Sequence, residues 1–303
     1  MTNGDRTRYI EIDVRSALNR VDSYRLPGLK WSLNPYRGCR HGCVYCYARY
    51  THTFLELDPD ADFTGTVFVK RNLVQALRED LRRPGWRREH VSIGTATDPY
   101  QPIEGRYRLT RGALEVLYEQ LTPASLVTKN TMAVRDAEIM AALAQRAGFR
   151  LIMSITTLDE ALARRLEPDV PGPQQRLAAV RALAQAGVPV AVAVAPILPG
   201  LNDDVAGLKA VIEAAYDHGA DIAFHQVLRL YDATRPTFFR YLETERPDLL
   251  PLYRRTYGAG REATPSYREA IAARIAALER RWRPRQSEKR LSETTAGQLA
   301  FEW

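Results

Sequence analysis

Short apolar runs alternate with amphipathic stretches along most of this sequence. Examples are "HVSIGTAT" before "LTRGALEVLYEQL", "ASLVTK" before "AVRDAEIMAALAQRAG" and "VPVAVAVAPI" before "DDVAGLKAVIEAAYDHG". Nearly continuous apolar strands separated by helices are typical of a parallel sheet whose strands are joined by right-handed helical crossovers. The alternation therefore predicts an α/β fold.

The number of strand candidates limits which α/β fold this is. They are "WSLNP", the runs that begin near Thr66, Val91, Ser125, Arg150 and Val188, and "ADIAFHQV". Six or seven βα units are too few for a closed eight-fold barrel, so we expect a partial (β/α)6 TIM-like barrel. We expect an N-terminal extension over residues 1–30, the barrel over 31–230, and a C-terminal helical extension over 231–303, where prolines interrupt the helical pattern.

Composition is that of a soluble globular protein, with 303 residues, 45% hydrophobic and 26% charged. No run approaches the roughly 18 apolar residues of a membrane span, and the first residues lack the apolar core of a signal peptide. We therefore expect a cytoplasmic protein without a membrane partner. The net charge of +7 only weakly favours a nucleic-acid partner, because 36 acidic residues offset most of the 43 Lys and Arg residues.

All three cysteines lie in one segment, "NPYRGCRHGCVYCYARY", as Cys39, Cys43 and Cys46. Three crowded cysteines favour a metal site over a disulfide framework. A zinc ion would need a distant fourth ligand, since His41 lies between the first two cysteines. An iron–sulfur cube held by three thiolates would keep one iron open for a ligand. Structural cysteines that lie together by chance are the remaining alternative.

The C-x3-C-x2-C spacing of these cysteines resembles the radical S-adenosylmethionine (radical SAM) superfamily. Together with "TDPYQPIE", "LVTKNT", "MSITT" and "PILPGLND", it resembles the spore photoproduct lyase-like branch. This resemblance implies a 4Fe-4S cluster on the three cysteines and S-adenosylmethionine as cofactor. One electron, from a flavodoxin, a ferredoxin or a reductase, would cleave that cofactor to a 5′-deoxyadenosyl radical, which abstracts hydrogen from a substrate.

The resemblance also implies a set of cofactor contacts at the ends of the predicted strands. Thr97 would donate from its hydroxyl, Asp98 would lie near the methionyl ammonium, and Lys129 would pair with the methionyl carboxylate. Ser154 would bond the methionyl or ribose end. The alternatives from the residues alone are a turn or helix cap for Asp98, a solvated strand end for Lys129 and a structural serine.

Ile197 and Leu201 would flank the adenine, and Tyr47, directly after the last cysteine, would contact it. These three contacts are again implied by the resemblance. The segment that follows Leu201 also fits a local role, because Asn202 and Asp203 are residue types that cap helices.

One departure from the resemblance concerns the reaction. Spore photoproduct lyase carries a further cysteine that returns hydrogen to the product, whereas this chain has Thr95 there and no fourth cysteine. Tyr45 and Tyr47 match a tyrosine pair of that enzyme and are candidate catalytic hydrogen donors, the alternative being that both only pack and contact adenine.

Two classes of function follow. The first is a radical SAM enzyme acting on an unidentified small molecule, natural product or peptide, with a nucleic-acid repair lyase as an alternative substrate class. The second is a non-catalytic iron–sulfur or electron-transfer protein. An electron carrier would normally have all four irons bound by protein ligands, which favours the enzyme.

Overall fold

A seven-stranded sheet forms the centre of the protein, in a computed structural model that describes residues 7–21 and 29–282. The strands lie side by side in the order β10 (Asp221–Val227), β9 (Val190–Ile197), β8 (Phe149–Ser154), β7 (Ala124–Thr128), β6 (Val91–Ile93), β3 (Trp31–Leu33) and β2 (Leu18–Arg20). The six strands from β10 to β3 are parallel, and β2 is antiparallel. Among the described residues the edge strands β10 and β2 do not pair, so the sheet is open. The predicted partial barrel is thereby confirmed.

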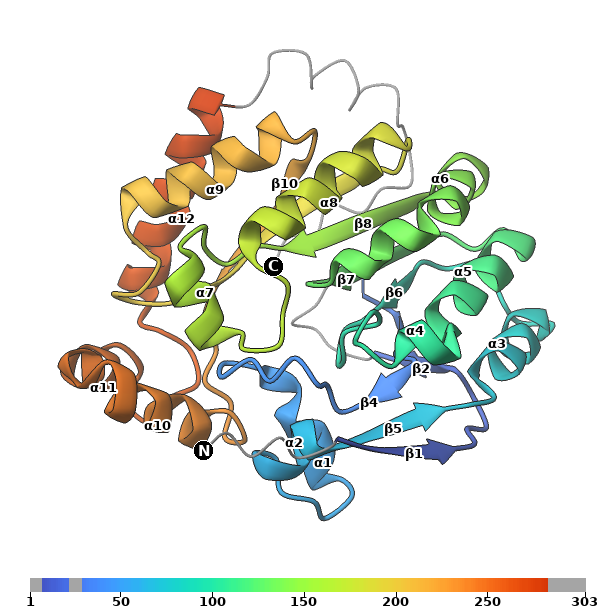
Figure 1. Ribbon diagram of the computed structural model, residues 1–303, viewed down its shortest axis with the longest axis horizontal. Coiled ribbons are helices and arrows are strands. Elements are labelled where there is room, and N and C mark those ends of the chain that lie inside the picture. The colour runs from blue at the N-terminus through green and yellow to red at the C-terminus, as the bar shows by residue number, and fades with distance from the viewer. Residues whose placement is uncertain (1–6, 22–28, 283–303) are drawn as a thin grey trace.

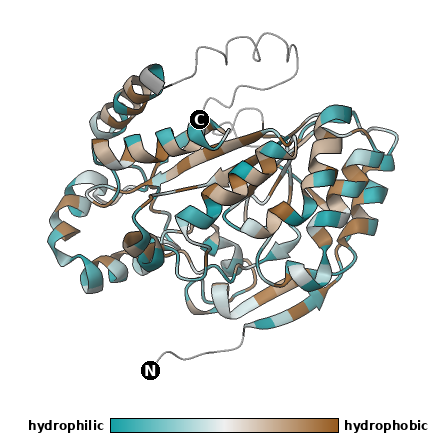
Figure 2. Ribbon diagram, turned by 45° about the horizontal axis from the view of Figure 1, so that its top comes forward, coloured by the Kyte–Doolittle hydropathy of each residue, from teal (hydrophilic) through white to brown (hydrophobic). Residues whose placement is uncertain are grey.

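Helices follow the parallel strands and pack around the sheet (Figure 1). They form because one face of each is apolar: α3 buries Leu73, Leu77 and Leu81, which lie four residues apart. Figure 2 shows the resulting division, with apolar strands inside and hydrophilic outer helix faces. The longer helices are α3 (Leu73–Arg82), α5 (Leu109–Glu119), α6 (Ala137–Arg146), α8 (Pro173–Gln185) and α9 (Val205–Asp217). Shorter ones are α1 (Tyr50–Thr53), α2 (Ala61–Gly65), α4 (Glu104–Tyr107), α7 (Glu160–Leu166), and the 3-10 helices η1 (Tyr47–Arg49) and η2 (Thr131–Asp136).

One predicted barrel strand belongs elsewhere. The run that begins at Thr66 forms β5 (Thr66–Lys70), which lies in a separate three-stranded sheet between β1 (Arg8–Ile12) and β4 (Tyr36–Arg37). The apolar pattern of β5 is real, since Val67 and Val69 are fully buried. Such a pattern does not specify the partner strand, however, and the crossover from β3 to β6 is made by α3 instead.

The described part of the C-terminal segment, residues 231–282, is helical, with α10 (Arg235–Glu245), the 3-10 helix η3 (Pro247–Leu249), α11 (Leu250–Tyr257) and α12 (Pro265–Trp282). Residues 283–303 of the predicted C-terminal extension, and residues 1–6 and 22–28 of the predicted N-terminal extension, lie outside the described residues. The helix α12 packs against α9 and β10 and buries Ile271 and Ile275, so this segment completes the outer layer beside the last strand. The N-terminal strands β1 and β2 extend both sheets. The domain boundaries at 30 and 230 stay predictions. No helix of the described ranges is both long and apolar enough for a membrane span.

Candidate cofactor site

The three cysteines lie on one loop, residues 34–46, which leaves the carboxyl end of β3 (hereafter the cysteine loop). Cys39 and Cys43 are buried, Cys46 is half-buried, and all three are free thiols. Backbone hydrogen bonds fix the loop: the N–H of Cys39 donates to the carbonyl of Phe63 at 3.1 Å, and the N–H of Val44 donates to that of Leu166 at 3.0 Å. The loop is thus held in place by two different helical segments.

Two glycines allow the backbone to fold this tightly. Gly38 has a φ of +84°, and a Cβ there would lie 2.6 Å from the carbonyl oxygen of Thr66. Gly94, which follows β6, has a φ of +86°, and its Cβ would lie 2.5 Å from the carbonyl oxygen of Val127. Both positions therefore require glycine, for its left-handed backbone and for the missing side chain.

The chemistry of the three thiols fits an iron–sulfur cluster. Burial raises the pKa of Cys43 well above its ordinary value, and it raises that of Cys46 to about 11 with the help of the neighbouring Cys39. Cys43 and Cys46 therefore ionise only beside strong positive charge, which cluster iron supplies to soft sulfur ligands. The described residues include no group of three or more His, Cys, Asp or Glu side chains that could hold a metal ion as they stand. The assignment therefore rests on the thiols' chemistry and their common loop.

Thr97 and Gln101 tie the loop after β6 to the cysteine loop. The hydroxyl of Thr97 donates to the carbonyl of Gly38 at 2.7 Å, and the side-chain amide of Gln101 donates to the same carbonyl at 3.2 Å. Gln101 also accepts from the backbone N–H of Arg40 at 3.1 Å. Thr97 therefore positions the cysteine loop, and its expected bond to the cofactor stays a prediction. The role of Gln101 was missed, although the residue lies in the quoted segment "TDPYQPIE".

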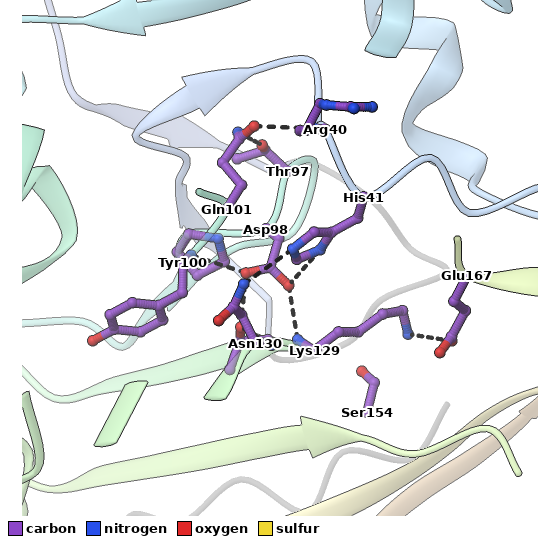
Figure 3. Close-up of polar contacts among 12 residues, drawn as sticks. Arg40, His41, Thr97, Asp98, Tyr100, Gln101, Lys129, Asn130, Ser154 and Glu167 are labelled. Atoms are coloured by element: carbon purple, nitrogen blue, oxygen red, sulfur yellow. Dashed lines mark hydrogen bonds and ion pairs between the residues drawn. The ribbon is translucent and has the colours of Figure 1, made fainter. Parts of the chain in front are cut away.

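Asp98 is the centre of a polar cluster between β6 and β7 (Figure 3). One carboxylate oxygen accepts from the backbone N–H of Tyr100 at 2.9 Å and from the Thr128 hydroxyl at 2.7 Å. The other accepts from the backbone N–H of Lys129 at 2.7 Å and lies 3.3 Å from Nδ1 of His41. Four protein groups thus surround the carboxylate. Its expected contact with the methionyl ammonium stays a prediction.

The pair of His41 and Asp98 is electrostatically coupled. Burial favours the neutral form of each side chain, but the attraction between them prevails. The pKa of His41 rises to about 10, because Asp98 and the nearby Cys39 outweigh burial, and the charge of His41 lowers the pKa of Asp98. Each group therefore stabilises the charged form of the other.

Lys129, directly after β7, reaches a buried carboxylate that sequence reasoning missed. Its ammonium lies 3.5 Å from Oε1 of Glu167 and 5.6 Å from the centre of the Tyr45 ring, and 16% of its side chain is exposed. Glu167 also accepts hydrogen bonds from the hydroxyls of Tyr45 and Thr156 and from the guanidinium of Arg176. Burial opposes the charge of Glu167, yet Arg176 and Lys129 lower its pKa to about 2. Lys129 is therefore not a solvated strand-end lysine.

Ser154, the last residue of β8, lies next to this group (Figure 3). It is buried, and its carbonyl accepts from the guanidinium of Arg176 at 2.8 Å. The expected bond from the Ser154 hydroxyl to the cofactor stays a prediction. Neither Glu167 nor Arg176 follows a strand directly, which is why no strand-end rule could have found them.

The structure separates the two candidate tyrosines. Tyr45 is buried, and its hydroxyl bonds Glu167. Tyr47 is 44% exposed, its hydroxyl donates to the carbonyl of Thr95, and its ring centre lies 6.0 Å from that of Tyr231. Of the two tyrosines, Tyr47 is therefore the one next to Thr95, the position at which a further cysteine was expected from the resemblance and is missing.

The proposed adenine-side loop follows β9. Ile197 ends that strand and is fully buried, whereas Leu201 is half-buried against the core. Asn202 holds the loop, since its side-chain amide donates to the carbonyls of Thr156 at 2.7 Å and of Pro196 at 3.1 Å. The adenine contacts of Ile197 and Leu201 stay predictions.

The helix cap expected at Asn202 or Asp203 lies one residue further on. Asp204 is the N-cap of α9, and its carboxylate accepts from the N–H of Gly207 at 2.8 Å. Asn202 is buried and used for the loop, and Asp203 accepts from the hydroxyl of Tyr267 at 2.6 Å. Both residues expected as caps, Asn202 and Asp203, make tertiary hydrogen bonds instead.

The segment "TDPYQPIE" has a structural reason of its own. Glu104 at its end is fully buried and accepts from the hydroxyl of Tyr36, from the N–H of Thr110 at 3.0 Å and from Arg135 at 3.1 Å. Because Tyr36 lies in the cysteine loop, this carboxylate attaches that loop to α5 and η2. The motif therefore holds the cysteine loop in place from a second side.

Comparisons with known proteins agree with this geometry. The family model of the radical SAM superfamily matches residues 33–208. An uncharacterized protein of Mycobacterium tuberculosis (strain H37Rv) is 39% identical over 279 residues, which cover 92% of this chain and 82% of the relative. An uncharacterized protein of Methanocaldococcus jannaschii is 27% identical over 194 residues, covering 64% of this chain and 70% of the relative.

Solved structures resemble the fold over nearly the whole chain. A mutant spore photoproduct lyase with dinucleoside spore photoproduct has a TM-score of 0.69 at 17% identity, covering 91% of this chain and 80% of that one. Another mutant, with bound AdoMet and the same dinucleoside, has a TM-score of 0.68 at 17% identity and the same coverage. The match of the superfamily model to residues 33–208, more than half of the sequence, shows that this chain belongs to the radical SAM superfamily.

Proposed function

We propose that this chain is a radical SAM enzyme acting on an organic substrate. The observation that carries the proposal is the position of the cysteine loop beside Asp98, Lys129 and Ser154, at the carboxyl ends of β3, β6, β7 and β8. Barrel enzymes build their sites at this end of the sheet. In this proposal Cys39, Cys43 and Cys46 hold a 4Fe-4S cluster and S-adenosylmethionine binds beside it.

When bound and reduced, the cluster and S-adenosylmethionine would supply the radical chemistry that abstracts hydrogen from the substrate. The protein's part is binding and orientation. Lys129 brings a compact cation to the methionyl carboxylate, with the hydroxyls of Thr97 and Ser154 as further contacts. Asp98 keeps the cysteine loop and the end of β7 in register through His41 and the Lys129 backbone.

The adenine side of the proposed site is formed by Tyr47, Ile197 and Leu201. Tyr47, the first residue of η1, is partly exposed and is the better placed of the two tyrosines to relay a hydrogen atom, because Tyr45 is buried and bonded to Glu167. We propose Tyr47 as the catalytic tyrosine. Tyr45, named with it from the sequence, then serves to hold Glu167.

The substrate proposed here is a small molecule, a natural product or a peptide. Thr95 stands where spore photoproduct lyase has its hydrogen-donating cysteine, and the Thr95 hydroxyl accepts from the side-chain amide of Asn34 at 3.1 Å. A threonine O–H bond is too strong to replace that thiol. A nucleic-acid lesion is the second candidate, favoured by the fold shared with a lyase bound to dinucleoside spore photoproduct.

We also propose a cytoplasmic location and a protein electron donor. The thiols and the cluster they would hold need a reducing compartment, which favours the cytoplasm. The electron donor would be a flavodoxin, a ferredoxin or a reductase. A non-catalytic role in electron transfer is disfavoured because three cysteines leave one of four irons without a protein thiolate.

The proposal is tested by anaerobic reconstitution with iron and sulfide, followed by reduction with dithionite and S-adenosylmethionine. We expect 5′-deoxyadenosine to form only when both the reductant and the cluster are present. A reconstituted, reduced protein that binds S-adenosylmethionine without ever cleaving it would instead support the non-catalytic alternative.

A further inference from the structure

Glu167 collects contacts from four separate parts of the chain. It directly follows α7, and its carboxylate meets Arg176 on α8, Tyr45 on the cysteine loop, Thr156 after β8 and Lys129 after β7. Its side chain is 1% exposed. A carboxylate buried this deeply requires compensating charge and hydrogen bonds, and Glu167 has both.

The two cations around Glu167 are held very differently. Arg176 bonds Oε2 directly, its side chain is 1% exposed, and a second guanidinium nitrogen donates to the Ser154 carbonyl at 2.8 Å. Lys129 lies 3.5 Å from Oε1, an oxygen that two hydroxyls already occupy, and it is the most exposed member of the group at 16%. Arg176 is thus a permanent partner, and Lys129 is an ion-pair partner without a short hydrogen bond.

The charges of this group do not cancel. One carboxylate faces two cations, Arg176 and Lys129, so the group carries a net charge of +1 when all three are ionised. If Lys129 turned to another anion, Glu167 would keep Arg176 and both hydroxyls. The loss to Glu167 is therefore small, while the arriving anion meets an ammonium that is already largely desolvated and confined next to the Tyr45 ring.

We propose that Glu167 is a positioning residue for cofactor binding, which holds the Lys129 ammonium at the end of β7 and yields it to the carboxylate of S-adenosylmethionine. This inference rests on the proposed function, since it assumes that Lys129 meets that carboxylate. In Glu167→Gln the ammonium no longer has an anion to hold it and faces the uncompensated guanidinium of Arg176. It then turns away from the site, and the affinity for the cofactor falls.

The test compares two ligands, S-adenosylmethionine and its decarboxylated analogue, by equilibrium binding to the reconstituted protein without reductant. We expect Glu167→Gln to weaken binding of S-adenosylmethionine by about tenfold and to leave the decarboxylated analogue nearly unchanged. Glu160→Gln, which removes an exposed carboxylate from the start of α7, is the matched control and should change neither.

A double-mutant cycle separates this role from a merely structural one. If Glu167 acts through Lys129, adding Glu167→Gln to Lys129→Ala should cause no further loss of affinity. Three results would overturn the inference. The first is a further tenfold loss of affinity when Glu167→Gln is added to Lys129→Ala. The others are, in Glu167→Gln alone, equal losses of affinity for S-adenosylmethionine and its decarboxylated analogue, or an unchanged or raised affinity for S-adenosylmethionine. If Glu167→Gln fails to fold or to take up iron, Glu167→Asp is used in its place. Aspartate keeps the negative charge, but its side chain is one methylene shorter, so the carboxylate lies further from the Lys129 ammonium. The aspartate variant should then show the same selective loss, and no selective loss would overturn the inference.

The result also distinguishes this inference from the proposed function. A native protein that binds neither ligand, or a Lys129→Ala variant with unchanged affinity, contradicts the proposed cofactor site and the inference with it. Weakened binding in Lys129→Ala beside normal binding in Glu167→Gln contradicts the inference alone.

Discussion

The imidazole of His41 lies 3.3 Å from the carboxylate of Asp98, and both side chains are almost fully buried. Through this contact the cysteine loop is attached to the ends of two neighbouring parallel strands. Asp98→Asn removes the negative charge from a buried pair, so we expect the free energy of unfolding of the iron-free protein to fall by about 3 to 5 kcal/mol. Urea denaturation measures this.

The matched control is Asp169→Asn. Asp169 also pairs with a residue of the cysteine loop, Arg40, at 2.7 Å, but the two side chains are 42% and 38% exposed. An exposed pair of this kind contributes at most about 1 kcal/mol. If Asp98→Asn and Asp169→Asn lower the free energy of unfolding equally, the buried pair of His41 and Asp98 holds the cysteine loop no more firmly than the exposed pair does.

Each cysteine of the loop should be indispensable for the cluster. Cys39→Ala, Cys43→Ala and Cys46→Ala should each abolish it, because three thiolates are the fewest that keep a cube with one open iron. The native protein should take up about four iron atoms per chain, measured by iron and sulfide analysis, while circular dichroism shows an unchanged fold. Full iron loading in one of these variants, or stoichiometric zinc in the native protein, contradicts the assignment.

Lys129→Ala should weaken binding of S-adenosylmethionine by about 1.5 to 3 kcal/mol, the range for a hydrogen bond to a charged group. Iron content should not change, because Lys129 is not a cluster ligand. Titration calorimetry on the reconstituted protein provides the measurement. Lys30→Ala is the control, since Lys30 precedes the amino end of β3 and its side chain is 68% exposed. If the native protein, Lys129→Ala and Lys30→Ala all bind S-adenosylmethionine with the same affinity, Lys129 has no role in binding it.

Stability should depend on pH through Glu167. Its pKa in the folded protein, about 2, lies below the ordinary value, so its contribution is complete above the unfolded pKa and is lost as the pH falls through about 2. The difference in unfolding free energy between the native protein and Glu167→Gln should therefore stay constant from pH 6 down to about pH 4.5 and then narrow as the pH falls towards 2. A difference independent of pH would mean that folding does not lower the pKa of Glu167.

A spore-photoproduct dinucleotide should not be converted to two thymines by the reduced enzyme. The reason is Thr95, which stands where spore photoproduct lyase has its hydrogen-donating cysteine and whose O–H bond is too strong to return hydrogen to the product. DNA binding should be weak and strongly reduced by salt. Product analysis beside 5′-deoxyadenosine decides the question. Conversion at a rate matching adenosyl cleavage would show that the substrate class is nucleic acid.

Local patterns in the sequence were enough for most of the fold. The β9 run from Val190 to Ile197 is nearly all apolar because the middle of a parallel sheet covers both faces of a strand, and such runs are visible without a structure. The strand at Thr66 was assigned to the wrong sheet because its alternation shows burial, not the identity of its neighbours.

The sequence could offer candidate side chains only through the spacing of the cysteines, through family resemblance or through a position that follows a strand. Asp98, Lys129 and Ser154 lie at strand ends, and the sheet itself brings such positions together. Glu167 follows a short helix and meets Lys129 through tertiary packing, across a separation in sequence that no local rule spans. The same holds for Glu104, whose buried carboxylate meets Tyr36 of the cysteine loop.

The contact between Thr234, the N-cap residue of α10, and the cysteine loop affects how the protein matures. The hydroxyl of Thr234 donates to the carbonyl of Cys46 at 3.0 Å, across 188 positions in the sequence, and Arg240 pairs with Asp60 nearby. During synthesis on the ribosome the three cysteines emerge long before Thr234 does. The loop therefore lacks this hydrogen bond while the chain is still growing, so a cluster assembled at that stage would form on a loop without the restraint that Thr234 adds in the finished protein.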